Sequence, residues 1–120
     1  GGITDYHLHL DYAALTGGGL VLYPHFQPVI VPGWLDKGLK SRHRTSAKLD
    51  NVVVLSPHPD WVRTLPGRKL PDRNDVKAYG DDAPSRARAW KRALDESQRL
   101  ADEFAELVTG GRAVEALPLP

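Results

Sequence analysis

The order of apolar and polar residues predicts a few short strands in the first half of the chain. The clearest signal is the unbroken apolar run VVVL at 52–55. Such a run is typical of a strand that is buried on both faces of a parallel sheet. The run LVLY at 20–23 predicts a second strand, which Pro24 ends because proline lacks the N–H that a ladder needs. Residues 3–10 alternate imperfectly between apolar and polar side chains and are a third strand candidate.

Prolines and glycines predict where the chain turns. Thr16 is followed by glycines at 17–19, which predicts a turn because glycine adopts positive φ without steric cost. The apolar run at 29–31 lies between two prolines, which favours an edge or irregular position. Residues 32–39 are expected to form a loop or a single helical turn.

The second half of the chain is predicted to be helical. The longest helix is expected at 84–109, roughly 39 Å long, with Pro84 in its first turn and Gly110 beyond its end. Apolar residues recur at spacings of three and four from Trp90 to Val108. This spacing predicts an apolar face that packs in a core.

Shorter helices are expected before the long one. Asp72, with Asp75 three residues later, is typical of a helix N-cap and predicts a helix that reaches about Tyr79. Another short helix is expected at 60–65, closed by the Pro-Gly pair that follows. Together these elements predict an α/β fold in which a few short strands of a mostly parallel sheet are covered by one long C-terminal helix.

Length and composition limit the size and class of the protein. At 120 residues the chain makes at most one small domain. The sequence has no methionine, and its strands and long helix offer few partners for one another's apolar faces. We therefore expect residues 1–120 to be the C-terminal fragment of a larger single domain.

The chain has no cysteine, which excludes disulfides, thiolate metal sites and a cysteine nucleophile. No apolar run approaches the roughly 20 residues that a membrane-spanning helix needs. A net charge of +1 gives no general reason to expect a nucleic-acid partner.

A metal site is one interpretation of the N-terminal pattern Asp5-x-His7-x-His9. Side chains two residues apart on a strand point to the same face, and imidazole is a ligand for Zn, Fe and Ni. The pattern is similar to the first-strand metal motif of amidohydrolase and PHP-type phosphoesterase families, although those families build whole barrels. The alternative is a pair of histidines at a strand end that bond to backbone or water. Three further side chains are available as additional ligands: His25, His58 and Asp60.

Ser56 is a second candidate, because it follows a predicted buried strand as a catalytic nucleophile does and His58 is near in sequence. The glycines of the G-x-S-x-G elbow are absent around it. Pro57 also removes a backbone N–H that would stabilise an oxyanion. We therefore expect a turn that ends the strand.

A third candidate is the segment in which Trp34 and Leu35 precede a basic run. Apolar anchors beside basic residues suit an anionic lipid surface, at about 1 kcal/mol for each basic residue near it. Nucleic-acid contact and a solvated loop with one buried tryptophan are the alternatives. The candidate membrane-contact residues are Trp34, Leu35, Lys37, Lys40, Arg42 and Arg44.

The opening residues GGITDYH resemble those that follow the catalytic aspartate of patatin-like phospholipases, whose motif is Asp-Gly-Gly or Asp-Gly-Ala. Other segments are similar to C-terminal segments of a bacterial branch of that family, and the resemblance covers nearly the whole chain. These segments are LVLYPHF at 20–26, VPGWLDK at 31–37, LDNVVVLSP at 49–57, LPGRKLPDR at 65–73 and LADEFAEL at 100–107.

The resemblance implies a partial patatin-like α/β fold and the hydrolysis of lipid acyl esters by a Ser–Asp dyad, without a metal or other cofactor. The dyad serine belongs to an upstream G-x-S-x-G elbow, and the aspartate precedes Gly1. Gly1 and Gly2 are then the remnant of the catalytic turn, no catalytic residue lies within the chain, and the isolated chain is expected to be inactive.

The resemblance implies two partners, the acyl-ester substrate and the N-terminal remainder of the domain. The segment that begins at Trp34 adds peripheral contact with a membrane as a further expectation, and the net charge gives no reason to expect nucleic acid. We expect the protein in the bacterial cytoplasm, either in solution or at the membrane surface. The alternatives are a fragment of a metal-dependent hydrolase that uses Asp5, His7 and His9, and a small module that binds lipid or nucleic acid.

Overall fold

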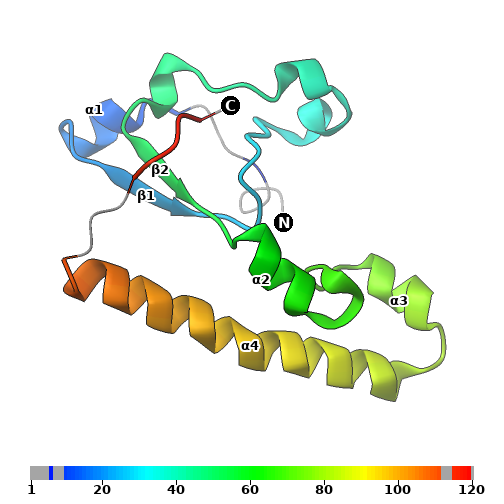
Figure 1. Cartoon of the computed structure of the whole chain (residues 1–120). Helices are drawn as coiled ribbons and strands as arrows, with labels where there is room; N and C mark the ends of the chain where they lie inside the picture. The colour runs from blue at the N-terminus through cyan, green and yellow to red at the C-terminus, as the bar shows by residue number, and fades with distance from the viewer. Residues whose placement is uncertain (1–5, 7–9, 112–114, 120) are drawn as a thin grey trace. The chain divides into compact units, whose positions relative to one another are not determined.

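The computed structural model describes residues 6, 10–111 and 115–119 (Figure 1). The chain forms two compact units. Unit 1 comprises Gly1–Ser56 and Glu115–Pro120, and unit 2 comprises Pro57–Val114. The described residues have mixed α/β structure with a parallel strand pair and one long C-terminal helix, which confirms the predicted α/β class.

Unit 1 contains the strands, one short α-helix and several turns of 3₁₀ helix. In chain order these are α1 (Tyr12–Thr16), β1 (Val21–Pro24), η1 (Trp34–Gly38), η2 (Lys40–Arg42), η3 (Ala47–Leu49) and β2 (Val52–Leu55). Unit 2 is helical, with α2 (Pro59–Thr64), η4 (Pro66–Arg68), α3 (Asn74–Tyr79) and α4 (Ala83–Thr109).

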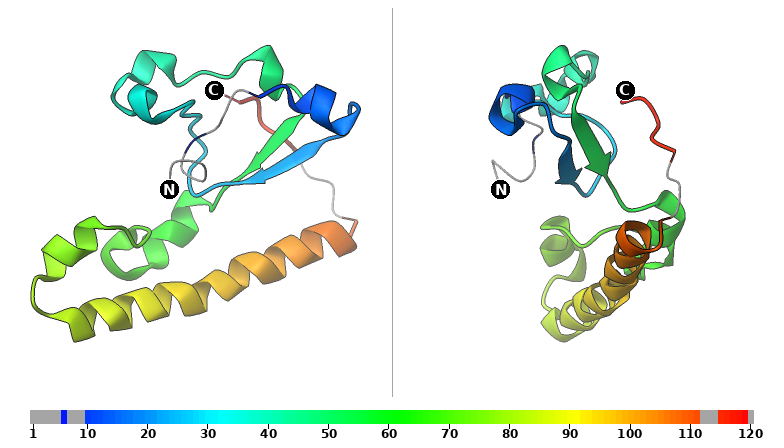
Figure 2. Two further views of the ribbon diagram at one scale, coloured as in Figure 1. Left: turned by 180° about the vertical axis from the view of Figure 1, so that it is seen from behind. Right: turned by 90° about the vertical axis from the view of Figure 1, so that its left-hand side faces the viewer.

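β1 and β2 form a parallel pair in which Val21 lies opposite Val52 and Pro24 lies opposite Leu55. The two strands lie side by side in both views of Figure 2. The strand predictions at 20–23 and 52–55 are confirmed, with β1 shifted by one residue so that Pro24 is its last member. The predicted strand at 3–10 falls largely outside the described residues.

The prediction that β2 is buried on both faces is wrong for this structure. Val52 is buried, but Val53 is 37% exposed, and Leu22, its partner across the ladder, is exposed as well. The described part of the sheet has two strands, and only one of its faces packs against the core of unit 1.

The core of unit 1 is centred on Ile30, which is completely buried and packs with Leu49 and Val52. Ile30 belongs to the apolar run at 29–31, for which the flanking prolines favoured an edge or irregular position. The run forms no strand. Partly buried apolar side chains complete the cluster: Tyr12, Val21, Tyr23, Val54 and Leu119.

α1 was not predicted from the sequence. Asp11 begins it by accepting a hydrogen bond from the backbone N–H of Ala14 at 3.0 Å. Gly17 ends it in the left-handed conformation, with φ at 61°, so the predicted turn after Thr16 is confirmed. The Asn51 side chain donates to the carbonyl oxygen of Gly19 at 2.7 Å and so ties this turn to the start of β2.

The helices of unit 2 begin and end largely where the sequence predicted. Asp82 accepts a hydrogen bond from the backbone N–H of Ser85 at 3.0 Å and caps α4, which starts one residue before Pro84. Gly110 follows the last helical residue, and its N–H donates to the carbonyl oxygen of Glu106 at 2.7 Å. A Cβ atom on Gly110 would lie 2.6 Å from that oxygen, so the position requires glycine.

The prediction that the whole apolar face of α4 packs in a core is wrong. Leu94 and Val108 are exposed, and Ala93 is the buried residue among those described in α4. Within unit 2, α4 packs against α3 and η4. These elements have six and three residues, whereas α4 has 27, so they cover only part of its length.

Candidate functional site

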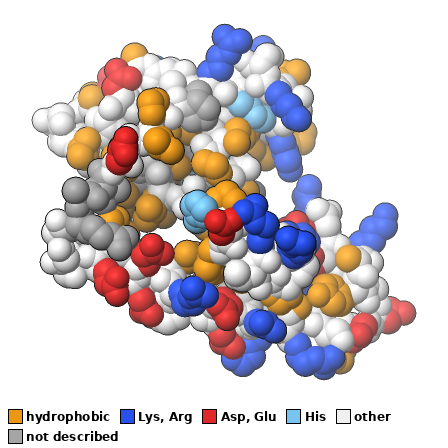
Figure 3. Space-filling view, in the orientation of Figure 1, with side chains coloured by type: hydrophobic (Ala, Val, Ile, Leu, Met, Phe, Trp, Pro, Cys, Tyr) orange, Lys and Arg blue, Asp and Glu red, His pale blue; other side chains and the backbone are white. Residues whose placement is uncertain are grey.

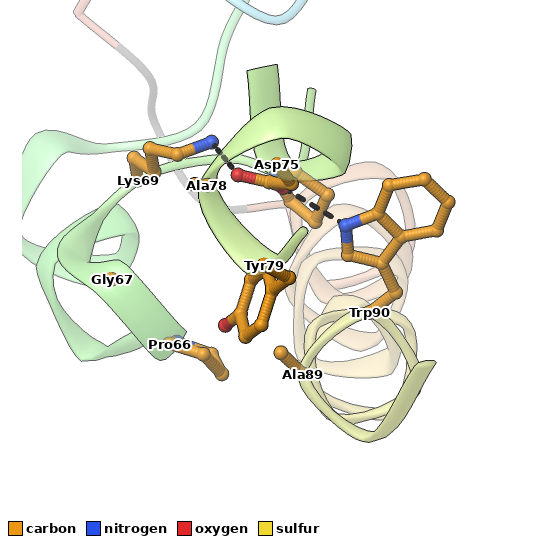
Figure 4. A pocket seen from close by; sticks show the side chains of 9 residues that line it. Pro66, Gly67, Lys69, Asp75, Ala78, Tyr79, Ala89 and Trp90 are labelled. Atoms are coloured by element: carbon orange, nitrogen blue, oxygen red, sulfur yellow. Dashed lines mark hydrogen bonds and ion pairs between the residues drawn. The ribbon is translucent and has the colours of Figure 1, made fainter. Parts of the chain in front are cut away.

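Unit 2 contains a pocket of about 230 Å³ between η4, α3 and the first part of α4 (Figure 4). This volume is below the roughly 300–1,000 Å³ of most drug-sized ligand sites. The residues that line it are Pro66, Gly67, Lys69, Pro71, Asp75, Ala78, Tyr79, Ala89 and Trp90.

The buried carboxylate of Asp75 is the polar centre of this pocket. Its Oδ1 lies 2.6 Å from the ammonium of Lys69, and its Oδ2 accepts a hydrogen bond from the indole N–H of Trp90 at 2.9 Å. Oδ2 also accepts from the backbone N–H of Asp72 at 3.1 Å. Both carboxylate oxygens therefore have donors, which fits the rule that a buried charge needs a partner.

The predicted cap at the start of α3 is part of the same network. The Asp72 side chain accepts a hydrogen bond from the backbone N–H of Asn74 at 2.7 Å, while Asp75 accepts from the backbone N–H of Asp72. This reciprocal arrangement is similar to a capping box, but the N-cap of α3 is Arg73, one residue after the predicted Asp72. Lys69, which lies 3.2 Å from Asp72, joins the cap to the pocket.

The network shifts the pKa of Asp75 and that of Lys69. The hydrogen bond from Lys69, and then the one from Trp90, lower the pKa of Asp75 from 3.8 to about 2, although burial opposes this shift. Burial lowers the pKa of Lys69, but hydrogen bonds to Asp75 and Asp72 outweigh that effect and raise it overall. Both groups are therefore charged at neutral pH.

Because the pKa of Asp75 is lowered, unit 2 is expected to become less stable as the solution becomes acidic. A carboxyl group whose pKa is lower in the folded state stabilises the fold above its unfolded pKa and loses that contribution as the pH falls. We expect the urea midpoint of the wild-type chain to approach that of Asp75→Asn as the pH falls from about 4 to about 2. A constant difference between the two midpoints across this range would contradict the assignment.

The indole of Trp90 is expected to stabilise unit 2 through its N–H. Trp90→Phe keeps an aromatic ring but removes the donor to Asp75, and should lower the free energy of unfolding by about 1 kcal/mol in urea titrations. Trp61 is the matched control. Its indole nitrogen is buried and has no hydrogen-bond partner among the described residues, so Trp61→Phe should not destabilise the chain. Equal losses in the two variants would contradict this role for the Trp90 N–H.

The geometry of the Asp75 network favours a structural role over acid–base catalysis. A general base must accept a proton near the operating pH, whereas the pKa of Asp75 is about 2 and both of its oxygens are engaged. Lys69, Asp75 and Trp90 hold α3 to the segment before it and to α4. Sequence analysis placed Asp72 and Asp75 at the start of this helix but missed Lys69 and Trp90 as their partners.

The predicted catalytic-turn and metal residues lie outside the described part of the chain. These are Gly1 and Gly2 of the catalytic turn and Asp5, His7 and His9 of the metal alternative. Among the described residues, no group of three or more His, Cys, Asp or Glu side chains is arranged to hold a metal ion.

The additional metal ligands considered above have other roles in the described structure. His58 accepts a hydrogen bond from the backbone N–H of Asp60 at 3.2 Å and thereby caps α2. His25 belongs to unit 1, where it is buried and its Nδ1 lies 3.1 Å from the carbonyl oxygen of Gln27.

Ser56 follows the last residue of β2, as predicted for a residue in the turn that ends the strand. Ser56 belongs to unit 1 and His58 to unit 2. Within unit 2, Nδ1 of His58 accepts a hydrogen bond from the backbone N–H of Asp60.

The basic segment after Trp34 forms two turns of 3₁₀ helix, η1 and η2. Trp34 and Leu35 are 72% and 76% exposed, so the alternative of a loop with one buried tryptophan is wrong. The candidate basic side chains are all exposed, and blue side chains gather over this segment in Figure 3. They are Lys37, Lys40, Arg42 and Arg44.

Within the described ranges, no helix has both the length and the apolar character that crossing a bilayer requires. Comparison of the chain with protein-family models, with curated proteins and with solved structures finds no match.

Proposed function

We propose that this chain is the C-terminal part of a patatin-like serine hydrolase that cleaves lipid acyl esters. The proposal is supported by the resemblance of segments along nearly the whole sequence to a bacterial branch of that family. In this proposal the catalytic serine and aspartate lie outside the chain. Unit 1 then supplies the glycines of the catalytic turn and two strands of the sheet, and the isolated chain is inactive.

The parallel pairing of β1 with β2 is the structural observation that best supports the proposal. Parallel strands occur almost only in sheets whose two faces are covered, and they need a crossover connection. Leu22 and Val53 leave one face of this pair apolar and exposed. A patatin-like α/β domain supplies the further strands and helices that would cover such a face.

The proposal is tested on the complete protein that contains this sequence. We expect its coding sequence to place Asp immediately before Gly1 and a G-x-S-x-G elbow further upstream. The protein should hydrolyse a p-nitrophenyl acyl ester and react with a fluorophosphonate, and Asp→Asn before Gly1 should abolish hydrolysis. A different residue at that position, or no upstream elbow, would refute the proposal.

A chelator separates this proposal from the metal-dependent alternative. Ser–Asp hydrolysis should continue in the presence of EDTA. Loss of activity with EDTA and its return with zinc would instead favour a site that uses Asp5, His7 and His9.

A further inference from the structure

We infer that the segment of η1 and η2 docks on the surface of an anionic lipid membrane. Its apolar tip consists of Trp34 and Leu35, two consecutive large side chains that are each about three-quarters exposed. Tryptophan is enriched at the interface between lipid and water, because its ring is apolar and its N–H is polar. The tip therefore has the chemistry of an interfacial anchor.

Local hydrogen bonds hold this tip in a fixed shape. The backbone N–H of Asp36 donates to the carbonyl oxygen of Gly33 at 3.1 Å. The backbone N–H of Leu39 donates to the carbonyl oxygen of Asp36 at 2.9 Å. The guanidinium of Arg42 binds the Asp36 carboxylate at 3.1 Å, and a ring nitrogen of His43 lies 2.9 Å from the Asp36 carbonyl oxygen. Since the turn is already formed, little conformational entropy is lost when it binds.

The charge around the tip is positive. Asp36 is the acidic residue of this segment, and it is engaged with Arg42. In the part of the chain that the structure describes, the ion pairs do not include Lys37, Lys40 or Arg44. Each basic side chain near an anionic membrane surface raises binding by about fivefold. The apolar tip and these cations therefore complement an anionic bilayer.

The apolar tip favours a membrane over nucleic acid as the partner. Phosphates would attract the same cations, and a base would stack on Trp34. Leu35 has no comparable use on a nucleic acid, whereas it gains by leaving water for the acyl region of a bilayer. Membrane binding would give the proposed lipid hydrolase a surface on which to act. Vesicle binding is measured without any hydrolysis, so the membrane inference and the proposed activity can fail independently of each other.

The test is cosedimentation of the full chain with vesicles of phosphatidylcholine that contain one third phosphatidylglycerol. The wild-type chain should bind these vesicles, should not bind phosphatidylcholine alone, and should dissociate as salt is added. Trp34→Ala/Leu35→Ala should weaken binding at least tenfold, whereas Leu15→Ala/Leu20→Ala, which removes two leucines of similar exposure from unit 1, should not.

A second pair of variants tests the charges. Lys37→Glu/Lys40→Glu should weaken binding at least about twentyfold. Arg73→Glu/Lys77→Glu makes the same change in net charge at exposed positions of unit 2 and should have little effect. Circular dichroism checks that each variant is folded.

Three results would overturn the inference. The first is no binding of the wild-type chain to the anionic vesicles at low salt. The second is equal binding by the tip variant and its control. The third is binding to duplex DNA without binding to the vesicles, which would assign the basic surface to nucleic acid.

Discussion

Asp75→Ala is expected to lower the melting temperature of unit 2 by roughly 10 °C. The substitution removes the acceptor for three donors: the ammonium of Lys69, the indole N–H of Trp90 and the backbone N–H of Asp72. The loss is expected to be large because the indole N–H of Trp90 and the backbone N–H of Asp72 would lose their acceptor, although Lys69 keeps its ion pair with Asp72.

Far-ultraviolet circular dichroism measures this effect, because α4 supplies much of the helical signal. Asp75→Asn separates charge from shape, since the amide is similar in size and keeps one acceptor oxygen. We expect it to destabilise unit 2 less than Asp75→Ala.

Asp95→Ala is the matched control for the loss of an ion pair. Asp95 is exposed and pairs with Lys91 at 2.9 Å, one helical turn away on α4. Such a pair contributes little, so the melting temperature should fall by no more than about 2 °C. A loss at Asp75 no larger than that at Asp95 would show that the buried network does not hold α3 to α4.

The contrast between the cap and its partners shows which features of this fold can be read from sequence. The hydrogen bonds of Asp72 and Asp75 at the start of α3 lie within four consecutive residues, and the spacing of the two acidic residues indicates a helix start there. The contact between Asp75 and Trp90 joins two helices and depends on how α3 folds back on α4. The helical spacing therefore placed Trp90 on the apolar face of α4 but gave no sign that its N–H has a buried partner.

The exposed face of β2 illustrates a second limit of sequence reasoning. The run at 52–55 predicts a strand, and the strand is present. Its apolar character does not reveal how many strands or helices lie around it, so the burial of Val53 was predicted wrongly. α1 was missed for a different reason, because its five residues are too few to establish a helical period.

Ile30→Ala is expected to destabilise unit 1 by about 2–5 kcal/mol. Ile30 is fully buried although its backbone belongs to neither strand, and it packs against Leu49 and Val52. Truncation would leave a cavity that the surrounding side chains fill only in part, and this adds to the lost transfer free energy. The same core supports Val52, so the pairing of β1 with β2 should weaken as well.

Amide hydrogen exchange measures this effect at the strand pair itself. The N–H of Val21 donates to the carbonyl oxygen of Asn51 at 2.8 Å, and the N–H of His25 donates to the carbonyl oxygen of Leu55 at 2.8 Å. In Ile30→Ala these two amides should exchange at least about thirtyfold faster. In Val29→Ala, which truncates an exposed neighbour in the same apolar run, they should exchange at close to the wild-type rate. If both variants exchange alike, Ile30 is not the centre of this core, and the strand pair must draw its stability from contacts other than the cluster of Ile30, Leu49 and Val52.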